Sequence, residues 1–192
     1  MEPDASQLVR AFRSGDSAAA VQLIELFYGR VYNFLRRLTA NEADAADLTQ
    51  QTFGRVWQRL SSFAERSSVS SWIHGIAYHV YVDWRRANGR TEARPSGWWD
   101  THESANSQPD EEAASADMRA TLYRQVERLE SDLRATVHCH YYQELTLQET
   151  ADAMGIATST VKYRLRQALD ELQRKLGADK ILTTHPESIR GR

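Results

Sequence analysis

The side chains with the clearest chemistry of their own lie in a basic segment near the C-terminus. Between Ser159 and Lys175 the chain has five basic and two acidic residues. Arginine and lysine bind phosphate, and hydroxyl and amide side chains form hydrogen bonds with the edges of bases. Polar and basic residues on one side of a single helix therefore predict contact with duplex DNA through Ser159, Thr160, Lys162, Tyr163, Arg164, Arg166 and Gln167.

Two helices joined by a turn would position these side chains. Thr146 and Glu149 have the spacing of a capping box, which starts a helix. Ala151, Gly155 and Val161 have the spacing of a helix-turn-helix, with a small residue where the helices cross, glycine in the turn and an aliphatic residue on the second helix. The alternative is an ordinary helical hairpin with a solvated basic face.

The rest of the chain also predicts helices. All four prolines lie near the two ends or between residues 95 and 109, so the long segments between them are free to be helical. Apolar residues recur there at helical spacing, without the alternation of a strand. One expected helix buries a stripe from Val21 to Leu38, and the others span about 4–13, 42–60, 70–87, 116–130 and 132–143.

An acidic segment separates two groups of helices. Residues 89–117 carry seven acidic residues against two arginines, so the net charge of -2 hides a locally basic C-terminal helix. Such a segment lacks the aliphatic residues to build a core and predicts a flexible acidic linker. The predicted fold class is all-α, with two small helical domains and a C-terminal helix-turn-helix. The expected divisions are 1–88, 89–115, 116–177 and a tail over 178–192.

Other site chemistry is not indicated. The sequence has no phosphate-cradling glycine loop and no nucleophile with a spaced base, so we expect neither an enzyme nor a cofactor. His138, Cys139 and His140 are ligand types, but consecutive helical positions point in different directions, so no metal site is expected. Trp98 and Trp99 could anchor a partner or pack on a helix.

The predicted compartment is the cytoplasm. No stretch approaches the roughly 18 apolar residues of a membrane-spanning helix, and the N-terminus lacks the pattern of a secretory signal, so no membrane insertion is expected. The single cysteine cannot form an internal disulfide, which fits a reducing compartment.

Three segments resemble one protein family. The segment LTLQETADAMGIATSTVKYRLRQALDELQRKL resembles the promoter-binding fourth region of extracytoplasmic-function (ECF, group 4) sigma factors of the sigma-70 family. DAADLTQQTFGRVWQRL resembles the family's segment for binding core polymerase, and FAERSSVSSWIHGIAYHVYVDWRR resembles its promoter-melting segment. The resemblance covers about 7–88 and 116–176. It implies an alternative sigma factor that binds core RNA polymerase and directs promoter-specific transcription initiation.

The resemblance implies three surfaces. The C-terminal helix would read the minus-35 element. Core RNA polymerase would be bound through two of its parts, the flap and the clamp helices of its largest subunit. The clamp helices would contact a polar side of the helix over 42–60, opposite Phe53, Val56 and Trp57. The residues on this polar side are Asp44, Asp47, Gln50 and Gln51. Promoter melting at the minus-10 element would use Phe63, Trp72, His79, Arg85 and Arg86.

Local chemistry agrees with the melting surface, because rings stack on unpaired bases and arginines hold phosphates. The alternative is that Trp72 packs under the loop 61–69 as a core residue. The family usually has asparagine where this chain has His79, and an acid where it has Gln51.

Other functions remain open at this point. The chain could be a stand-alone helix-turn-helix regulator that binds duplex DNA, or a helical scaffold that binds protein and no DNA. The resemblance also implies a partner protein, an anti-sigma factor that covers the polymerase-binding surfaces.

Overall fold

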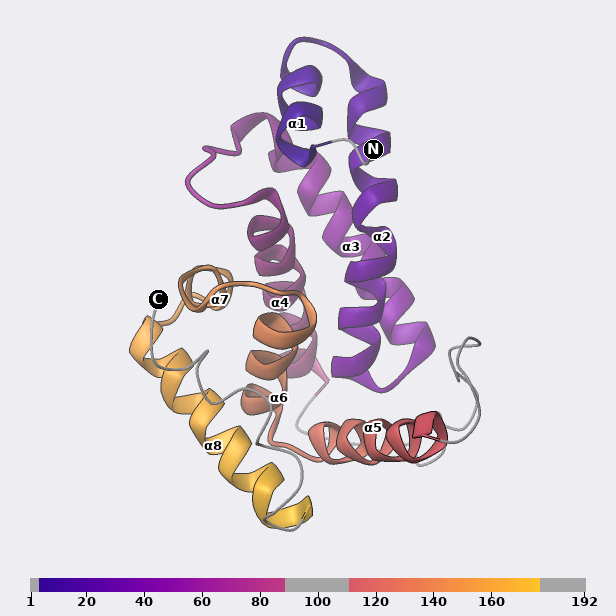
Figure 1. The fold of residues 1–192 in the computed structure, drawn as a ribbon. Coiled ribbons are helices and arrows are strands. Elements are labelled where there is room, and N and C mark those ends of the chain that lie inside the picture. The colour runs from indigo at the N-terminus through magenta and orange to yellow at the C-terminus, as the bar shows by residue number, and fades with distance from the viewer. Residues whose placement is uncertain (1–3, 89–110, 177–192) are drawn as a thin grey trace.

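The computed structural model describes residues 4–88 and 111–176 of the chain. The N-terminal half contains α1 (Ala5–Arg13), α2 (Ser17–Thr39), α3 (Glu42–Arg59), the short 3-10 helix η1 (Leu60–Ser62) and α4 (Val69–Ala87). The C-terminal half contains α5 (Glu111–Glu127), α6 (Ser131–Val137), the π-helical turn η3 (His138–Tyr142), α7 (Leu147–Met154) and α8 (Thr158–Leu176). Figure 1 shows this arrangement, and the described residues confirm the predicted all-α class.

Polar caps start the first four helices. The side chains of Asp4, Asp16, Asn41 and Ser68 each accept a backbone N–H from the first turn of the helix that follows. These bonds satisfy donors that have no partner inside a helix, which is why the helices begin at these positions.

The N-terminal half is built around an antiparallel pair, α2 and α3, with α4 packed along both (Figure 1). Val21, which we expected in the buried stripe, is 50% exposed, and Trp57, which we expected on the side opposite the polar residues, is 47% exposed. Each directly follows a buried position, Ala20 and Val56, and one residue turns a helix by about 100°. That rotation carries both side chains off the buried stripe.

The segment between the two halves differs from the prediction at its end. α5 begins at Glu111, so the last residues of the predicted linker 89–115 are helical. Residues 89–110, which include Trp98 and Trp99, and the predicted tail 178–192 lie outside the described residues. The helix expected over 132–143 is α6 followed by η3, where the Gln143 N–H bonds to the carbonyl of His138 at 3.0 Å, five residues back.

The helix-turn-helix is confirmed in its local details. Thr146 Oγ1 accepts the Glu149 N–H at 3.2 Å, and the Glu149 carboxylate accepts the Thr146 N–H at 3.0 Å, which completes the capping box. Gly155 has a φ of 66°, a left-handed conformation that favours glycine. Ala151 and Val161 are buried between α7 and α8, as the spacing predicted.

The two halves share a hydrophobic core. Ala135, Cys139, Leu145, Ala153 and Met154 of the C-terminal half are buried in the same cluster as the side chains of α2 and α4. Helices α4 and α7 approach each other closely, because a Cβ added to Gly75 would lie 3.2 Å from the Cα of Ala153. Helix α7 therefore packs directly against α4 of the N-terminal half. None of the described helices has the length and apolar character to cross a membrane.

Candidate DNA-binding and protein-binding surfaces

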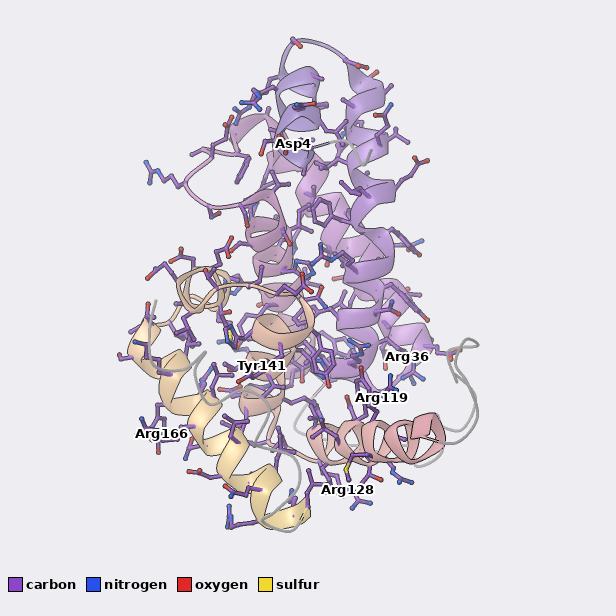
Figure 2. All side chains as sticks on the ribbon, in the orientation of Figure 1. Asp4, Arg36, Arg119, Arg128, Tyr141 and Arg166 are labelled. Carbon is purple, nitrogen blue, oxygen red and sulfur yellow. The ribbon has the colours of Figure 1, made fainter. Side chains whose placement is uncertain are left out.

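The outer side of α8 presents most of the predicted DNA contacts. Val161, Leu165 and Ala168 face the core, which leaves the intervening positions outward. Tyr163 is 60% exposed, and Arg166 projects from the outer side of the helix in Figure 2. The other outward residues are Ser159, Lys162 and Gln167, with Thr160 partly covered. This is the position of a recognition helix in a helix-turn-helix protein.

Arg164 is the exception on this helix. Its side chain is only 18% exposed, and Nη2 lies 2.6 Å from the carboxylate of Asp132 at the start of α6. A charge-assisted bond of this length is stronger than one between neutral groups. Arg164 therefore makes an internal ion pair in this structure.

At the start of α4, Phe63 and Trp72 form a pair. Their ring centroids are 4.7 Å apart, and Phe63 is 5% exposed while Trp72 is partly buried. The Phe63 carbonyl accepts a hydrogen bond from Arg13. Phe63 is thus buried beneath Trp72, and Trp72 is the ring of this pair that solvent can reach.

The remaining predicted minus-10 residues lie further along α4. His79 is exposed beside the turn of the helix-turn-helix, because a Cβ on Gly155 would lie 3.8 Å from its ring. Arg86 is exposed near the end of the helix. Arg85, by contrast, reaches into the C-terminal half, where it contacts the Ser131 hydroxyl and lies 3.3 Å from Asp132.

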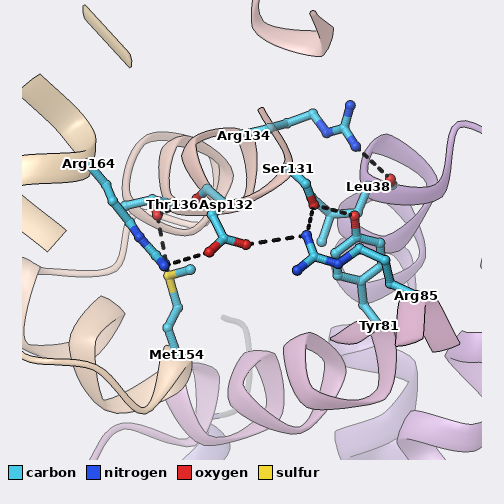
Figure 3. Close-up of polar contacts among 9 residues, drawn as sticks. All are labelled: Leu38, Tyr81, Arg85, Ser131, Asp132, Arg134, Thr136, Met154 and Arg164. Atoms are coloured by element: carbon cyan, nitrogen blue, oxygen red, sulfur yellow. Dashed lines mark hydrogen bonds and ion pairs between the residues drawn. The ribbon is translucent and has the colours of Figure 1, made fainter. Parts of the chain in front are cut away.

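Asp132 thus contacts an arginine from each predicted DNA surface. Figure 3 shows its carboxylate between Arg85 of α4 and Arg164 of α8. The neighbouring Ser131 hydroxyl also bonds to the Tyr81 hydroxyl of α4 at 2.9 Å. The three helices meet at these two residues at the start of α6. The sequence analysis did not single out Asp132, and its pairing with distant positions leaves no local signal.

The predicted polymerase surface lies on the free side of α3. Asp47, Gln50 and Gln51 are exposed, and Asp44 is partly exposed with its N–H bonded to the Asn41 side chain at 3.1 Å. Trp57 lies two turns beyond Gln50 on the same side of the helix. The prediction missed Trp57 as a surface residue because it assigned that ring to the core.

The three residues considered as metal ligands have different surroundings in the structure. His138 and Cys139 are fully buried, and His140 Nδ1 lies 2.7 Å from the carbonyl oxygen of Leu145. Burial raises the pKa of the Cys139 thiol to about 12. Within residues 4–88 and 111–176, no group of three or more His, Cys, Asp or Glu side chains could hold a metal ion.

Family comparisons match both halves. Sigma-70 region 2 matches residues 23–91, and Sigma-70, region 4 matches residues 126–174. Among solved structures, the complex of CnrH with the cytosolic domain of CnrY has a TM-score of 0.66 at 20% identity and covers 92% of this chain and 99% of that one. The sigma factor RpoE in complex with the anti-sigma factor NepR from Bartonella quintana has a TM-score of 0.65 at 21% identity over 83% of this chain and 97% of that one. These two structures share its fold.

Two sequence relatives have higher sequence identity to this chain than the two structures above. The ECF RNA polymerase sigma factor RpoE of Cereibacter sphaeroides is 30% identical over 177 residues, which are 88% of this chain and 93% of that protein. The ECF RNA polymerase sigma factor SigX of Bacillus subtilis is 29% identical over 158 residues, 80% of this chain and 81% of that protein. Because two regions of one family match in order and a full-length relative aligns over most of the chain, this protein belongs to the ECF RNA polymerase sigma factors of the sigma-70 family, alternative sigma factors that direct transcription initiation.

Proposed function

We propose that this sigma factor, a member of group 4, uses α3 to bind core polymerase, α4 to open the minus-10 element and α8 to read the minus-35 element. The observation that carries the proposal is the separation of three exposed surfaces on three helices. Asp47 and Gln50 lie on α3, His79 and Arg86 on α4, and the row around Arg166 on α8. The domains would be 1–88 and 116–177, joined by 89–115, with catalysis supplied by polymerase.

Purified protein and core polymerase in promoter-dependent transcription test this function. We expect initiation from a subset of promoters in a genomic library and none from core polymerase alone. A factor that binds promoter duplexes tightly without polymerase and stimulates no initiation would contradict the proposal. No feature of the described residues favours a stand-alone regulator or a scaffold over a sigma factor.

An anti-sigma factor is the second partner that we propose. Two structures with this fold, CnrH and RpoE, are complexes with CnrY and with the anti-sigma factor NepR. The exposed side of α3 is the polymerase-binding surface that such a partner would cover. A protein that works with RNA polymerase and is regulated in this way would act in the bacterial cytoplasm.

Replacing Arg166 should separate the two binding activities. Arg166→Ala removes an outward guanidinium from α8, and one such contact with DNA is worth about 1–3 kcal/mol. We expect roughly tenfold weaker binding of holoenzyme to a minus-35 duplex, with unchanged affinity for core polymerase. Arg174→Ala, two turns away on the same helix, is the matched control. Equal losses of DNA and polymerase binding would contradict the assignment of α8.

Replacing Trp72 should impair opening more than closed-complex formation. Trp72→Ala removes a ring that water reaches, and stacking of one base on an aromatic ring is worth about 1–3 kcal/mol. We expect about tenfold fewer open complexes by permanganate reactivity of the melted strand. Trp72→Phe, which keeps a ring over Phe63, should recover most of the reactivity. Unchanged reactivity in the alanine variant would show that Trp72 only packs on Phe63.

A further inference from the structure

We propose that Arg13, the last residue of α1, is a positioning residue for promoter opening. It holds the loop between η1 and α4, which carries Phe63, and through Phe63 it sets the position of the Trp72 ring. The inference deepens the proposed role of α4 in opening the minus-10 element and rests on it. The sequence offers no local sign of this role, because the two loop groups that Arg13 contacts lie 50 and 52 positions further along the chain.

Arg13 binds two groups of this loop with separate nitrogens. Nη1 donates to the carboxylate of Glu65 at 2.6 Å, and Nη2 donates to the backbone carbonyl of Phe63, where the loop runs beside the end of α1 (Figure 1). The ion pair with Glu65 would by itself contribute little, because the two side chains are 31% and 42% exposed. The bond to the carbonyl has a different effect, because it fixes the backbone that carries the Phe63 ring.

The conformation of the loop is not one that its residue types favour. Glu65 has a φ of 54°, a left-handed conformation that residues with a Cβ rarely adopt. The Phe63 N–H bonds to the carbonyl of Leu60 at 3.4 Å, which is longer than a usual hydrogen bond. Arg13 contacts the left-handed residue and the residue two positions before it. These contacts from α1 therefore hold the loop in a conformation that its own sequence supports poorly.

The position of Phe63 affects Trp72 by direct contact. The two ring centroids are 4.7 Å apart, and Phe63 is buried while Trp72 is partly exposed. The same loop ends at Ser68, whose hydroxyl accepts the Ser71 N–H at 3.1 Å and starts α4 one turn before Trp72. A shift of the loop would therefore move the ring beneath Trp72 and the first turn of its helix. Stacking of an unpaired base on Trp72 would then weaken.

Helix α1 is anchored independently of this loop. Leu8 and Val9 are buried in the hydrophobic core, and Phe12 packs against Trp57 with ring centroids 5.8 Å apart. These contacts fix the backbone of α1 up to the residue before Arg13. The guanidinium therefore reaches the loop from a fixed point, which is what a positioning residue requires.

Permanganate reactivity of the melted strand tests the proposal with holoenzyme, on a promoter from which the wild-type protein initiates. Arg13→Ala should give about fivefold fewer open complexes, because both bonds to the loop are lost. Binding to core polymerase and to a minus-35 duplex should stay within about twofold of wild type, because those surfaces are distant from the loop. Arg10→Ala is the matched control, since it removes an exposed guanidinium one turn earlier on α1 and should leave the reactivity unchanged. Thermal midpoints verify that each variant is folded.

A double-mutant cycle separates positioning from a general loss of stability. If Arg13 acts through the Trp72 ring, Arg13→Ala should lower the reactivity by less than about twofold in a protein that already carries Trp72→Ala. Glu65→Gln leaves the bond to the Phe63 carbonyl in place and should stay within about twofold of wild type. An equal fold loss with and without the Trp72 ring would overturn the proposal, and so would Arg13→Ala reactivity equal to that of wild type. Both overturning results leave the proposed function standing, because initiation by the wild-type protein with core polymerase is measured separately.

Discussion

Acidification from pH 7 to pH 5 is expected to lower the free energy of unfolding by about 2 kcal/mol through His74 alone. His74 is fully buried in α4, and its burial lowers the pKa from 6.5 to about 4. The imidazole Nδ1 donates to the Ser70 carbonyl at 2.8 Å, which leaves Nε2 as the atom that would be protonated. Burial of the ring is the main reason that its charged form is disfavoured, and the charge of Arg30 adds to this, while the Gln143 side chain offsets only part of the effect.

The sign of the effect follows from where the proton binds. Between pH 6.5 and about 4, the unfolded chain takes up a proton at His74 and the folded protein does not. Stability from this group is therefore complete above pH 6.5 and is lost as pH falls toward 4. Burial also lowers the pKa of His138, beside Glu127 at 3.4 Å, so its contribution has the same direction.

Urea denaturation at a series of pH values from 4 to 7 measures this dependence. His74→Gln should be less stable at pH 7, but its free energy of unfolding should depend less steeply on pH. The slope should fall by up to about 1.4 kcal/mol per pH unit, which is the contribution of one proton. His79→Gln makes the same substitution at an exposed position of the same helix and is the matched control. A His74→Gln slope equal to that of wild type would contradict the account.

Local signals predicted much of the fold. The capping box at Thr146 and the glycine at 155 each act within one turn of a helix, so residue type and spacing were enough to place α7, the turn and α8. Resemblance to a family added the surfaces on α3 and α4. Asp47 and Gln50 are exposed on α3, but Trp57, which the pattern put on the opposite side, lies on the side of Gln50.

The docking of the two halves was not predictable from periodicity. Asp132 pairs with residues 47 positions before it and 32 positions after it, and a helical pattern carries no information at such separations. The prediction treated Arg164 as an outward residue of the second helix, and the family resemblance placed Arg85 on the minus-10 surface. Both side chains instead reach the start of α6, where they contact Asp132, and only the tertiary structure shows this.

Trp57→Ala is expected to weaken binding to core polymerase about 30-fold, the effect of losing about 2 kcal/mol at an aromatic hot spot. The indole is 47% exposed on the side of α3 that carries Gln50, and its inner edge rests on Phe12 at 5.8 Å between ring centroids. This contact fixes the ring beside polar groups while leaving apolar area for a partner to cover. A large exposed ring of this kind at a polar surface is typical of the centre of a protein interface.

Fluorescence titration of labelled sigma factor with core polymerase measures the loss, with the thermal midpoint recorded for each variant. Tyr141→Ala is the matched control, because it removes an aromatic ring that is 42% exposed in the C-terminal half. We expect the control to bind within about twofold of wild type, and Trp57→Phe to fall between the two, since the smaller ring keeps part of the apolar area. Binding energy at an interface comes from the side chains that the partner desolvates. If Trp57→Ala binds core polymerase like wild type, this ring is not part of the polymerase surface. The surface would then consist of Asp47, Gln50 and Gln51.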